Sequence, residues 1–237
     1  MHAVIFGAFG GIGSALTQAL AARNDVELVH AVSRSGVEGG GKIASHIADI
    51  TDEAALSAVA EAIKARGAPD LVIVASGILS DGDALQPEKS YRHQSMDAFE
   101  RVFRINTFGP GLVAKHMFPI MPRAQRAVFA ALSARVGSIS DNGLGGWHAY
   151  RASKAALNML IRNYAIEQAR RTDQFICVGL HPGTVDTGLS EPFQGNVPDK
   201  KLFTPDYAAQ QLLGVIDGLR PGDTGKVFDW AGEEIPA

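Results

Sequence analysis

Residues 3–13, AVIFGAFGGIG, join an apolar run to a glycine-rich turn near the start of the chain. The apolar run predicts a buried β-strand, and apolar residues recur at helical spacing over residues 12–20 behind the turn. Glycines between a strand and a helix let the backbone approach a pyrophosphate, whose charge is favoured by the free amides and dipole of the helix N-terminus. The segment therefore predicts a β-α unit that binds a dinucleotide, the alternative being a purely structural turn.

The alternation of strand and helix patterns continues along the chain. Strands are expected at residues 27–34, 70–77, 126–133, 175–183 and 225–230, and helices at residues 51–67, 96–121, 148–160 and 204–219. Thr51 and Thr204 are expected to cap two of these helices. This order predicts a single-domain α/β Rossmann fold: a doubly wound parallel sheet of about seven strands with helices on both faces. We find no linker or repeat, so residues 1–237 are expected to form one domain.

The composition narrows the classes of protein that the chain can belong to. Hydrophobic residues make up 46% of it and charged residues 20%, which allows a proper core. The net charge of −3, without blocks of like charge, argues against nucleic acid or an anionic membrane as the main partner. The longest apolar run, residues 71–79, is shorter than the ~20 residues of a membrane helix. No leader-like segment is seen, and the single cysteine, Cys177, cannot form an internal disulfide, so a cytoplasmic protein is expected.

Residues 148–160, HAYRASKAALNML, place a tyrosine and a lysine four positions apart in a predicted helix. Tyr150 and Lys154 would then lie one turn apart on the same face. A free tyrosine, with a pKa near ~10, is a poor proton shuttle at neutral pH, and a nearby ammonium group favours its phenolate form. The pair is therefore a candidate proton donor with the cation that tunes it, although such a spacing also occurs on solvated helix faces.

In order along the chain, these motifs resemble those of the short-chain dehydrogenase/reductase family. Gly7, Gly11 and Gly13 reproduce its G-x-x-x-G-x-G spacing, with Phe6 where the family usually has threonine. More narrowly, residues 132–160 and 225–237 resemble the C-factor-like and sniffer-like carbonyl reductases. The resemblance implies a nicotinamide cofactor and the reduction of an aldehyde or ketone to an alcohol.

The resemblance also assigns the cofactor-binding residues. They are Gly7, Phe9, Gly10, Gly11, Ile12, Gly13, Ser33, Arg34, Asp49, Ile50, Ala75, Ser76, Gly77, Tyr150, Lys154, Pro182, Gly183, Val185 and Thr187. Ser33 and Arg34 stand where an NAD-selective enzyme commonly carries a carboxylate. A serine beside an arginine suits a 2′-phosphate instead, so NADP(H) is preferred, with NAD(H) as the alternative. Asp49 and Ile50 are expected near the adenine, and residues 182–187 around the nicotinamide carboxamide.

Four residues are implied as catalytic: Asn106, Ser133, Tyr150 and Lys154. Tyr150 would protonate the substrate oxygen, and Lys154 would tune the phenol and hold the nicotinamide ribose. Asn106 would hold a water in the proton path. Ser133, fixed at a strand end, would hold the substrate oxygen; Ser138, whose distance from the tyrosine is closer to the family's, is the alternative. No metal site is expected.

The remaining predictions concern substrate and partners. Residues 188–203 are expected to form a short lid with an apolar cover of Phe193, Leu202 and Phe203, and Trp147 is expected near its mouth. The partners would be a small carbonyl or alcohol substrate and further copies of the chain, in a homodimer or homotetramer packed through the long helices. The alternatives are a dinucleotide-binding signalling or regulatory protein with little turnover, and a nucleotide-sugar epimerase. The epimerase is disfavoured because such enzymes usually have a larger C-terminal substrate domain.

Overall fold

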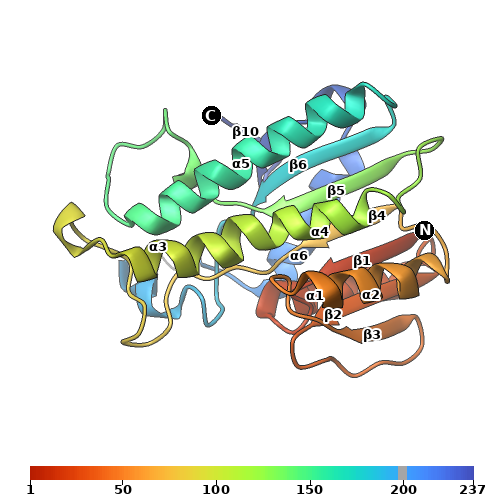
Figure 1. Cartoon of the computed structure of the whole chain (residues 1–237), viewed down its shortest axis with the longest axis horizontal. Helices are drawn as coiled ribbons and strands as arrows, with labels where there is room; N and C mark the ends of the chain where they lie inside the picture. Colours follow the sequence, from red (N-terminus) through yellow and green to blue (C-terminus); the bar gives the residue numbers. More distant parts are fainter. Residues whose placement is uncertain (197–201) are drawn as a thin grey trace.

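An eight-stranded sheet forms the centre of the computed structural model, which describes residues 1–196 and 202–237 (Figure 1). Its strands are β1 (His2–Phe6), β2 (Leu28–Ser33), β3 (Ile43–Ile47), β4 (Leu71–Val74), β5 (Ala127–Leu132), β6 (Phe175–His181), β9 (Val227–Asp229) and β10 (Glu234–Ile235). The order is β10-β9-β6-β5-β4-β1-β2-β3, and only the pair of β9 and β10 in this described sheet is antiparallel. The predicted fold class, a doubly wound and mostly parallel α/β sheet, is therefore confirmed. A separate parallel pair joins β7 (Thr184–Val185) to β8 (Leu202–Phe203).

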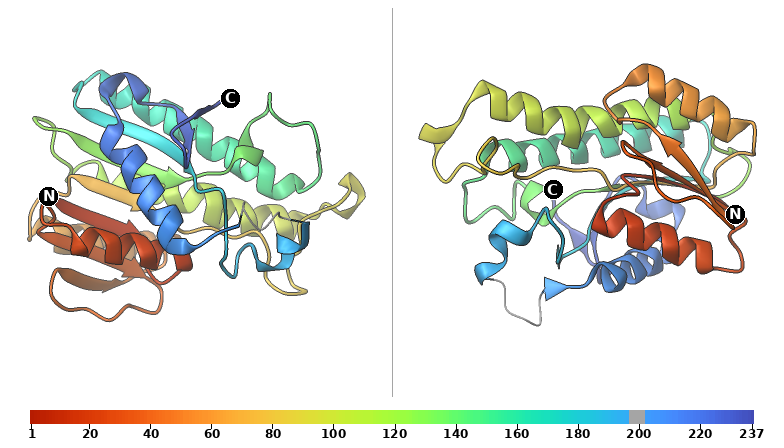
Figure 2. Two further views of the ribbon diagram at one scale, coloured as in Figure 1. Left: turned by 180° about the vertical axis from the view of Figure 1, so that it is seen from behind. Right: turned by 90° about the horizontal axis from the view of Figure 1, so that it is seen from below.

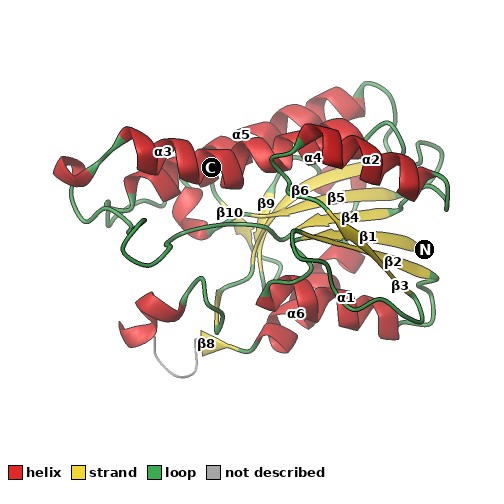
Figure 3. Cartoon of the chain, turned by 60° about the horizontal axis from the view of Figure 1, so that its bottom comes forward, coloured by secondary structure: helices red, strands yellow, loops and turns green. Residues whose placement is uncertain are grey.

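Helices cover both faces of the sheet, so the molecule has three layers (Figure 3). One face carries α1 (Gly11–Ala22) and α6 (Pro205–Gly218), and the other carries α2 (Glu53–Lys64), α4 (Gly109–Met117) and α5 (His148–Ala169). Helix α3 (Met96–Phe103) continues into α4 through a π-helical turn, Arg104–Phe108. Short 3-10 helices lie at Tyr91–His93, Arg135–Gly137, Glu191–Asn196 and Pro221–Asp223. No helix of residues 1–196 and 202–237 has both the length and the apolar character that a membrane span requires.

The two layers of helices bury two separate apolar cores. In β4, Leu71 and Ile73 point into the core beneath α1 and α6, whereas Val72 and Val74 point into the core beneath α2, α4 and α5. All four side chains are buried. A strand covered on both faces is apolar at every position, and for this reason the central strands can be predicted from the sequence.

Strand β3 is the longest of the strands that the sequence analysis did not predict. Residues 43–47, IASHI, form the edge of the sheet beside β2, and no residue of the strand is fully buried. Polar Ser45 and His46 interrupt the apolar pattern, as is usual in an edge strand with one covered face. Together with the short β10, this strand gives the sheet eight strands where about seven were predicted.

One predicted helix cap is wrong and another is confirmed. Helix α2 is capped by Asp52, whose side chain accepts a hydrogen bond from the amide of Ala55 at 3.0 Å. Thr51 instead donates its hydroxyl to Asp49 at 2.8 Å. At α6, Thr204 accepts from the amide of Tyr207 at 3.2 Å, as predicted.

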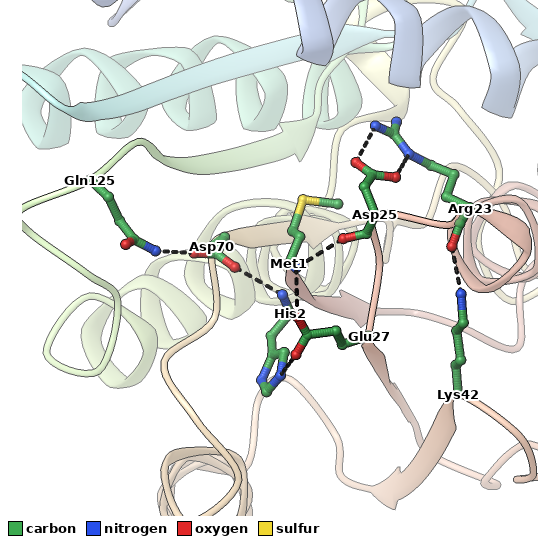
Figure 4. Close-up of polar contacts among 8 residues, drawn as sticks. All are labelled: Met1, His2, Arg23, Asp25, Glu27, Lys42, Asp70 and Gln125. Atoms are coloured by element: carbon green, nitrogen blue, oxygen red, sulfur yellow. Dashed lines mark hydrogen bonds and ion pairs between the residues drawn. The ribbon is translucent and has the colours of Figure 1, made fainter.

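Polar contacts join the amino ends of the strands (Figure 4). The carboxylate of Asp70 accepts from the amide of His2 at 2.8 Å and from the side chain of Gln125 at 2.7 Å, so it joins β1 to the segments before β4 and β5. Arg23 forms an ion pair with Asp25 at 2.9 Å in the turn after α1. The opposite, carboxyl ends of the strands carry the long loops at residues 75–95 and 133–147 (Figure 2).

Candidate active site

A cavity of about 460 Å³ lies at the carboxyl ends of β1, β2 and β4. Many residues predicted to bind a cofactor line it: Gly7, Phe9, Gly10, Ser33, Arg34, Asp49, Ile50, Ala75, Ser76 and Gly77. The strand order reverses on either side of β1 at this point, and open α/β sheets bind ligands at such a reversal. The other residues predicted to bind the cofactor do not line this cavity.

The glycine turn lies against both neighbouring strands. Gly7 has a φ of +86°, and a Cβ at this position would lie 2.7 Å from the amide nitrogen of Ser76, so only glycine fits. A Cβ at Gly13 would collide with the carbonyl oxygen of Gly7, which explains how closely α1 approaches the turn. The amide of Gly7 donates to Val32 at 2.9 Å and ties the turn to β2. Gly11 and Ile12 begin α1, so their amides are available at the helix N-terminus.

The end of β2 presents a hydroxyl and a guanidinium to the cavity. Ser33 is 6% exposed, and its Oγ has no hydrogen-bond partner within the described residues. Arg34 follows it, is exposed, and forms no ion pair with any described residue. On the far side, Oδ1 of Asp49 accepts from the amide of Thr51 at 2.8 Å, so this carboxylate has a fixed position. Buried polar atoms normally have partners, so the hydroxyl of Ser33 suits a ligand that supplies one.

Tyr150 and Lys154 lie buried on α5, 9% and 3% exposed. The Nζ of Lys154 lies 5.7 Å from the centre of the Tyr150 ring and donates to the main-chain oxygen of Leu132 at 2.7 Å. A Cβ at Gly77, in the cavity wall, would lie 3.8 Å from this Nζ. Burial raises the pKa of Tyr150 to about 12 and lowers the pKa of Lys154 to about 8. The phenol is therefore protonated at neutral pH, and the ammonium group is held close to it.

Asn106 occupies the π-helical turn and is fully buried. Its Oδ1 accepts from the amide of Ile78 at 2.8 Å, and its Nδ2 donates to the main-chain oxygen of Ile78 at 2.8 Å and to Ser153 Oγ at 3.2 Å. The side chain thus braces the loop after β4 against α5. Both Nδ2 protons are used in these contacts, whereas Oδ1 accepts one hydrogen bond and keeps a second lone pair.

The two candidate serines differ in whether the hydroxyl already donates its proton in a hydrogen bond. Ser133 is 4% exposed, and its hydroxyl donates to Asn158 Oδ1 on α5 at 2.6 Å. Ser138 is 3% exposed, and its Oγ accepts from the amide of Asp141 at 3.1 Å, which leaves its proton available. Ala134, which follows Ser133, lies in the apolar cluster that contains Tyr150. The hydrogen bonding therefore favours Ser138 as the donor to a substrate oxygen.

The segment after β6 reaches back to the glycine turn. The Thr187 side chain lies against the backbone of Gly11, and Val185 in β7 is buried. Gly183, after Pro182, has a φ of +78° and lies against the ring of Phe203. These residues, predicted to hold the nicotinamide carboxamide, thus lie between the turn and the base of the predicted lid.

The predicted lid, residues 188–203, is described only in part, because residues 197–201 lie outside the described residues. Gly188 and Leu189 line the cavity. Phe193 lies on a 3-10 helix, with its ring centre 5.2 Å from that of Trp147. Phe203 packs against Trp230 at 4.7 Å, beside β7, rather than forming a cover. Of the lid residues that the structure describes, Phe193 is therefore the one whose ring packs against Trp147.

Further cavity residues come from the loop after β4 and from α3, and the sequence did not suggest them. Asp81 and Arg101 both line the cavity and form an ion pair with each other. An arginine on a helix and an aspartate in a loop carry no pairing signal in a single sequence. No group of three or more His, Cys, Asp or Glu residues suited to a metal ion occurs in residues 1–196 and 202–237.

Comparison with known proteins shows that the chain is similar to oxidoreductases. The profile of the family described as short chain dehydrogenase matches residues 1–197. The C-signal of Myxococcus xanthus is 40% identical over 136 residues, which are 57% of this chain and 76% of that protein. The 1-hydroxy-2-glutathionyl-2-methyl-3-butene dehydrogenase of Rhodococcus sp. is 30% identical over 181 residues, 75% of this chain and 73% of that protein.

The structural likeness extends over the whole chain. An NADPH-bound carbonyl reductase from chicken fatty liver matches with a TM-score of 0.85 and 26% identity, covering 100% of this chain and 98% of that one. The carbonyl reductase Sniffer of D. melanogaster matches with a TM-score of 0.84 and 19% identity, covering 100% and 99%. The likeness to Sniffer is one of fold alone.

Proposed function

The chain belongs to the short chain dehydrogenase family of NAD(P)-dependent oxidoreductases, and from that premise we propose that it reduces an aldehyde or ketone with NADPH, with Tyr150 as the general acid. The observation that carries the proposal is the buried pair of Tyr150 and Lys154, with the Nζ of Lys154 next to Gly77 in the cavity wall. The likeness to an NADPH-bound carbonyl reductase supports a carbonyl group as the site of reaction.

The residues around the cavity fit an NADP(H) molecule. The amides at the start of α1 would hold its pyrophosphate, and the segment from Pro182 to Thr187 would hold its carboxamide. The unpartnered hydroxyl of Ser33 and the guanidinium of Arg34 suit a 2′-phosphate, so NADP(H) is preferred to NAD(H). When bound, the cofactor supplies the hydride that the carbonyl carbon receives.

Tyr150 supplies the proton. With a pKa of about 12 the phenol carries its proton at neutral pH and can give it to the carbonyl oxygen as that oxygen gains charge. The phenolate left behind is stabilised by the ammonium of Lys154, which the carbonyl of Leu132 holds in place. A serine hydroxyl, Ser133 or Ser138, would hold the substrate oxygen, and Asn106 would hold the water that returns the proton.

The test is NADPH oxidation with a panel of aldehydes and ketones, with NADH in the same assay. We expect turnover with NADPH and weaker binding of NADH. The Tyr150→Phe variant keeps the ring but loses the proton, so kcat should fall by about 10²-fold or more. Unchanged turnover in this variant would refute the assignment of the general acid.

Tyr164→Phe is the matched control. Tyr164 lies on the same helix, and burial also raises its pKa to about 12. It packs edge-on against Phe118, in the core beneath α4 and α5. Tyr164 is half-buried, so its hydroxyl is less enclosed than that of Tyr150. If a phenol on α5 mattered only for stability, both variants would lose activity; we expect only Tyr150→Phe to lose it.

A second candidate function follows from the similarity to C-signal. The name of that relative favours a dinucleotide-binding protein that signals with little turnover. Such a protein would bind NADPH with a Kd similar to that of an active enzyme but would not oxidise it with any carbonyl compound in the panel. The binding measurement and the turnover measurement together therefore separate the two candidates.

A further inference from the structure

Trp147 has a backbone conformation that bulky residues rarely adopt. Its φ is 50° and its ψ is 44°, and among residues 1–196 and 202–237 it is the only non-glycine residue with a positive φ. It follows Gly145 and Gly146, whose φ values are also positive. A bulky side chain stays in the left-handed region only where its surroundings fix it there, and such positions cluster at functional sites.

Glu88, in the loop after β4, fixes this conformation from a distant part of the sequence. It is 4% exposed, and its main-chain oxygen accepts from the amide of Trp147 at 2.6 Å. Its carboxylate oxygens accept from the amide of Ala149 at 3.2 and 3.3 Å. Trp147 stands at the N-cap position of α5, so the carboxylate of Glu88 takes the place of a capping side chain and complements the helix dipole.

The constrained backbone directs the indole toward Tyr150. The indole centre lies 6.3 Å from the ring of Tyr150, at an interplanar angle of 78°, and 5.2 Å from the ring of Phe193. The neighbours in this cluster, Leu79, Val136 and Ala134 among them, are apolar. The indole thus lies between the ring of the proposed general acid and a second aromatic ring, within one apolar cluster.

We propose that Trp147 is a specificity-determining residue and Glu88 a positioning residue, and that together they select carbonyl compounds with a flat aromatic group next to the carbonyl. The inference rests on the proposed function. A planar ring pairs with the face or edge of an indole, whereas a puckered aliphatic ring of the same size gains only apolar contact. Because the indole is fixed before the substrate arrives, little ordering is needed on binding.

The test compares benzaldehyde with cyclohexanecarbaldehyde, which share a six-membered ring and differ in planarity. The wild-type protein should have the higher kcat/KM with benzaldehyde, mainly through a lower KM. In Trp147→Gly, glycine accepts the left-handed backbone, and the ratio of the two kcat/KM values should fall by about fivefold. Trp147→Phe keeps an aromatic wall and should keep most of the ratio.

Two variants test Glu88 in the same assay. Glu88→Ala should lower the aromatic-to-aliphatic ratio, because the indole loses its fixed position. Glu88→Gln retains an oxygen that can accept from Ala149 and should restore the ratio. A role of Glu88 in stability alone would lower both kcat/KM values, or the Tm, without changing their ratio, and this result would overturn the positioning role.

Fluorescence gives a readout that does not need turnover. The chain has two tryptophans, so in Trp230→Phe the emission comes from Trp147. Benzyl alcohol should change this emission at lower concentration than cyclohexylmethanol does. Equal responses to both alcohols would overturn the inference, even if NADPH oxidation supports the proposed function. Absence of NADPH oxidation with a clear preference for benzyl alcohol would refute the reductase and still support the aromatic site.

Discussion

We expect Lys154 to set the upper pH limit of the proposed reduction. Burial lowers its pKa to about 8, so the ammonium that stabilises the phenolate is present below this pH and is lost above it. The pKa of Tyr150, about 12, is too high for the phenol to lose its proton in this range. The logarithm of kcat measured from about pH 6 to about pH 10 should therefore be level and then fall, by about tenfold per pH unit, above about pH 8.

An arginine at this position provides the control. Arg keeps its charge throughout the range, so Lys154→Arg should be slower, because its geometry differs, but should lack the fall near pH 8. A wild-type profile that stays level to about pH 10 would contradict the role of the lysine.

Separate alanine substitutions of Ser133 and Ser138 should have different effects on kcat. Ser138→Ala removes a hydroxyl with an available proton, so we expect kcat to fall by about 10²-fold, as for the loss of one donor to a developing oxyanion. Ser133→Ala removes the bond to Asn158 and should cost about 1 kcal/mol of stability, with a smaller effect on kcat. The opposite order of kcat values would return the role to Ser133.

In the candidate site, residues that line the cavity could be predicted from the sequence more readily than the partners that those residues contact. Gly7 and Ser33 were predicted from the sequence, and both line the cavity. They could be predicted because a turn between a strand and a helix, and the end of a strand, leave a clear local pattern. Glu88 and Arg101 left no such pattern. Each acts through a partner far along the chain, the amide of Ala149 and the carboxylate of Asp81. Spacing along one chain cannot reveal such a partner, nor which serine hydroxyl is already donating.

Among the elements, the buried ones were predictable and the irregular ones were not. Strands β4 and β5 are apolar at every position because helices cover both faces. Strand β3 lies at an edge and has no such run. The long helix predicted at residues 96–121 contains the π-helical turn at Arg104–Phe108, which packs against α5 and leaves little trace in the apolar spacing.

The strands β2 and β3 carry a histidine pair that should make this edge of the sheet sensitive to acid. Nδ1 of His30 lies 2.9 Å from Nε2 of His46, and His30 is fully buried. Burial, with smaller contributions from His46, Arg66 and His2, lowers the pKa of His30 to about 4, and burial and Arg66 lower that of His46. Below the unfolded-state pKa of about 6.5 the unfolded chain binds protons that the folded chain does not, so stability falls from about pH 6.5 toward about pH 4.

Replacement of His30 tests this linkage. In His30→Leu the loss of unfolding free energy between about pH 6.5 and about pH 4 should be smaller by on the order of 2 kcal/mol, measured by urea unfolding at each pH. The exposed His93, in a 3-10 helix, is the control, and His93→Leu should follow the wild-type curve. Parallel curves for His30→Leu and wild type would contradict the linkage.

In the molecule as a whole, the amino ends and the carboxyl ends of the strands have different roles. Hydrogen bonds such as those of Asp70 join the strands at their amino ends, while the cavity lies at their carboxyl ends on either side of β1. This arrangement follows from the parallel, doubly wound order, which the alternation of elements predicted. What the alternation cannot predict is how the outer faces of the helices are used.

The outer face of α5 and the turn before α4 should pack against a second copy of the chain. Phe108, Met159 and Ile166 are 58%, 61% and 43% exposed, although their helices already cover the sheet with their inner faces. The two helices run side by side across one face of the molecule (Figure 1). Large exposed apolar side chains on a helix face are typical of interaction surfaces, and a two-fold axis would bring the same face of two chains together.

We therefore expect a homodimer in solution, measured by light scattering coupled to size-exclusion chromatography, and a monomer in the double variant Met159→Asp, Ile166→Asp. Burying two carboxylates in an apolar interface is unfavourable, so the dimer should weaken by ~10²-fold or more in Kd. Leu144→Asp is the matched control, because Leu144 is 93% exposed but lies in the loop before α5. A monomeric wild-type protein, or a double variant that remains dimeric, would show that this face is not the interface between copies.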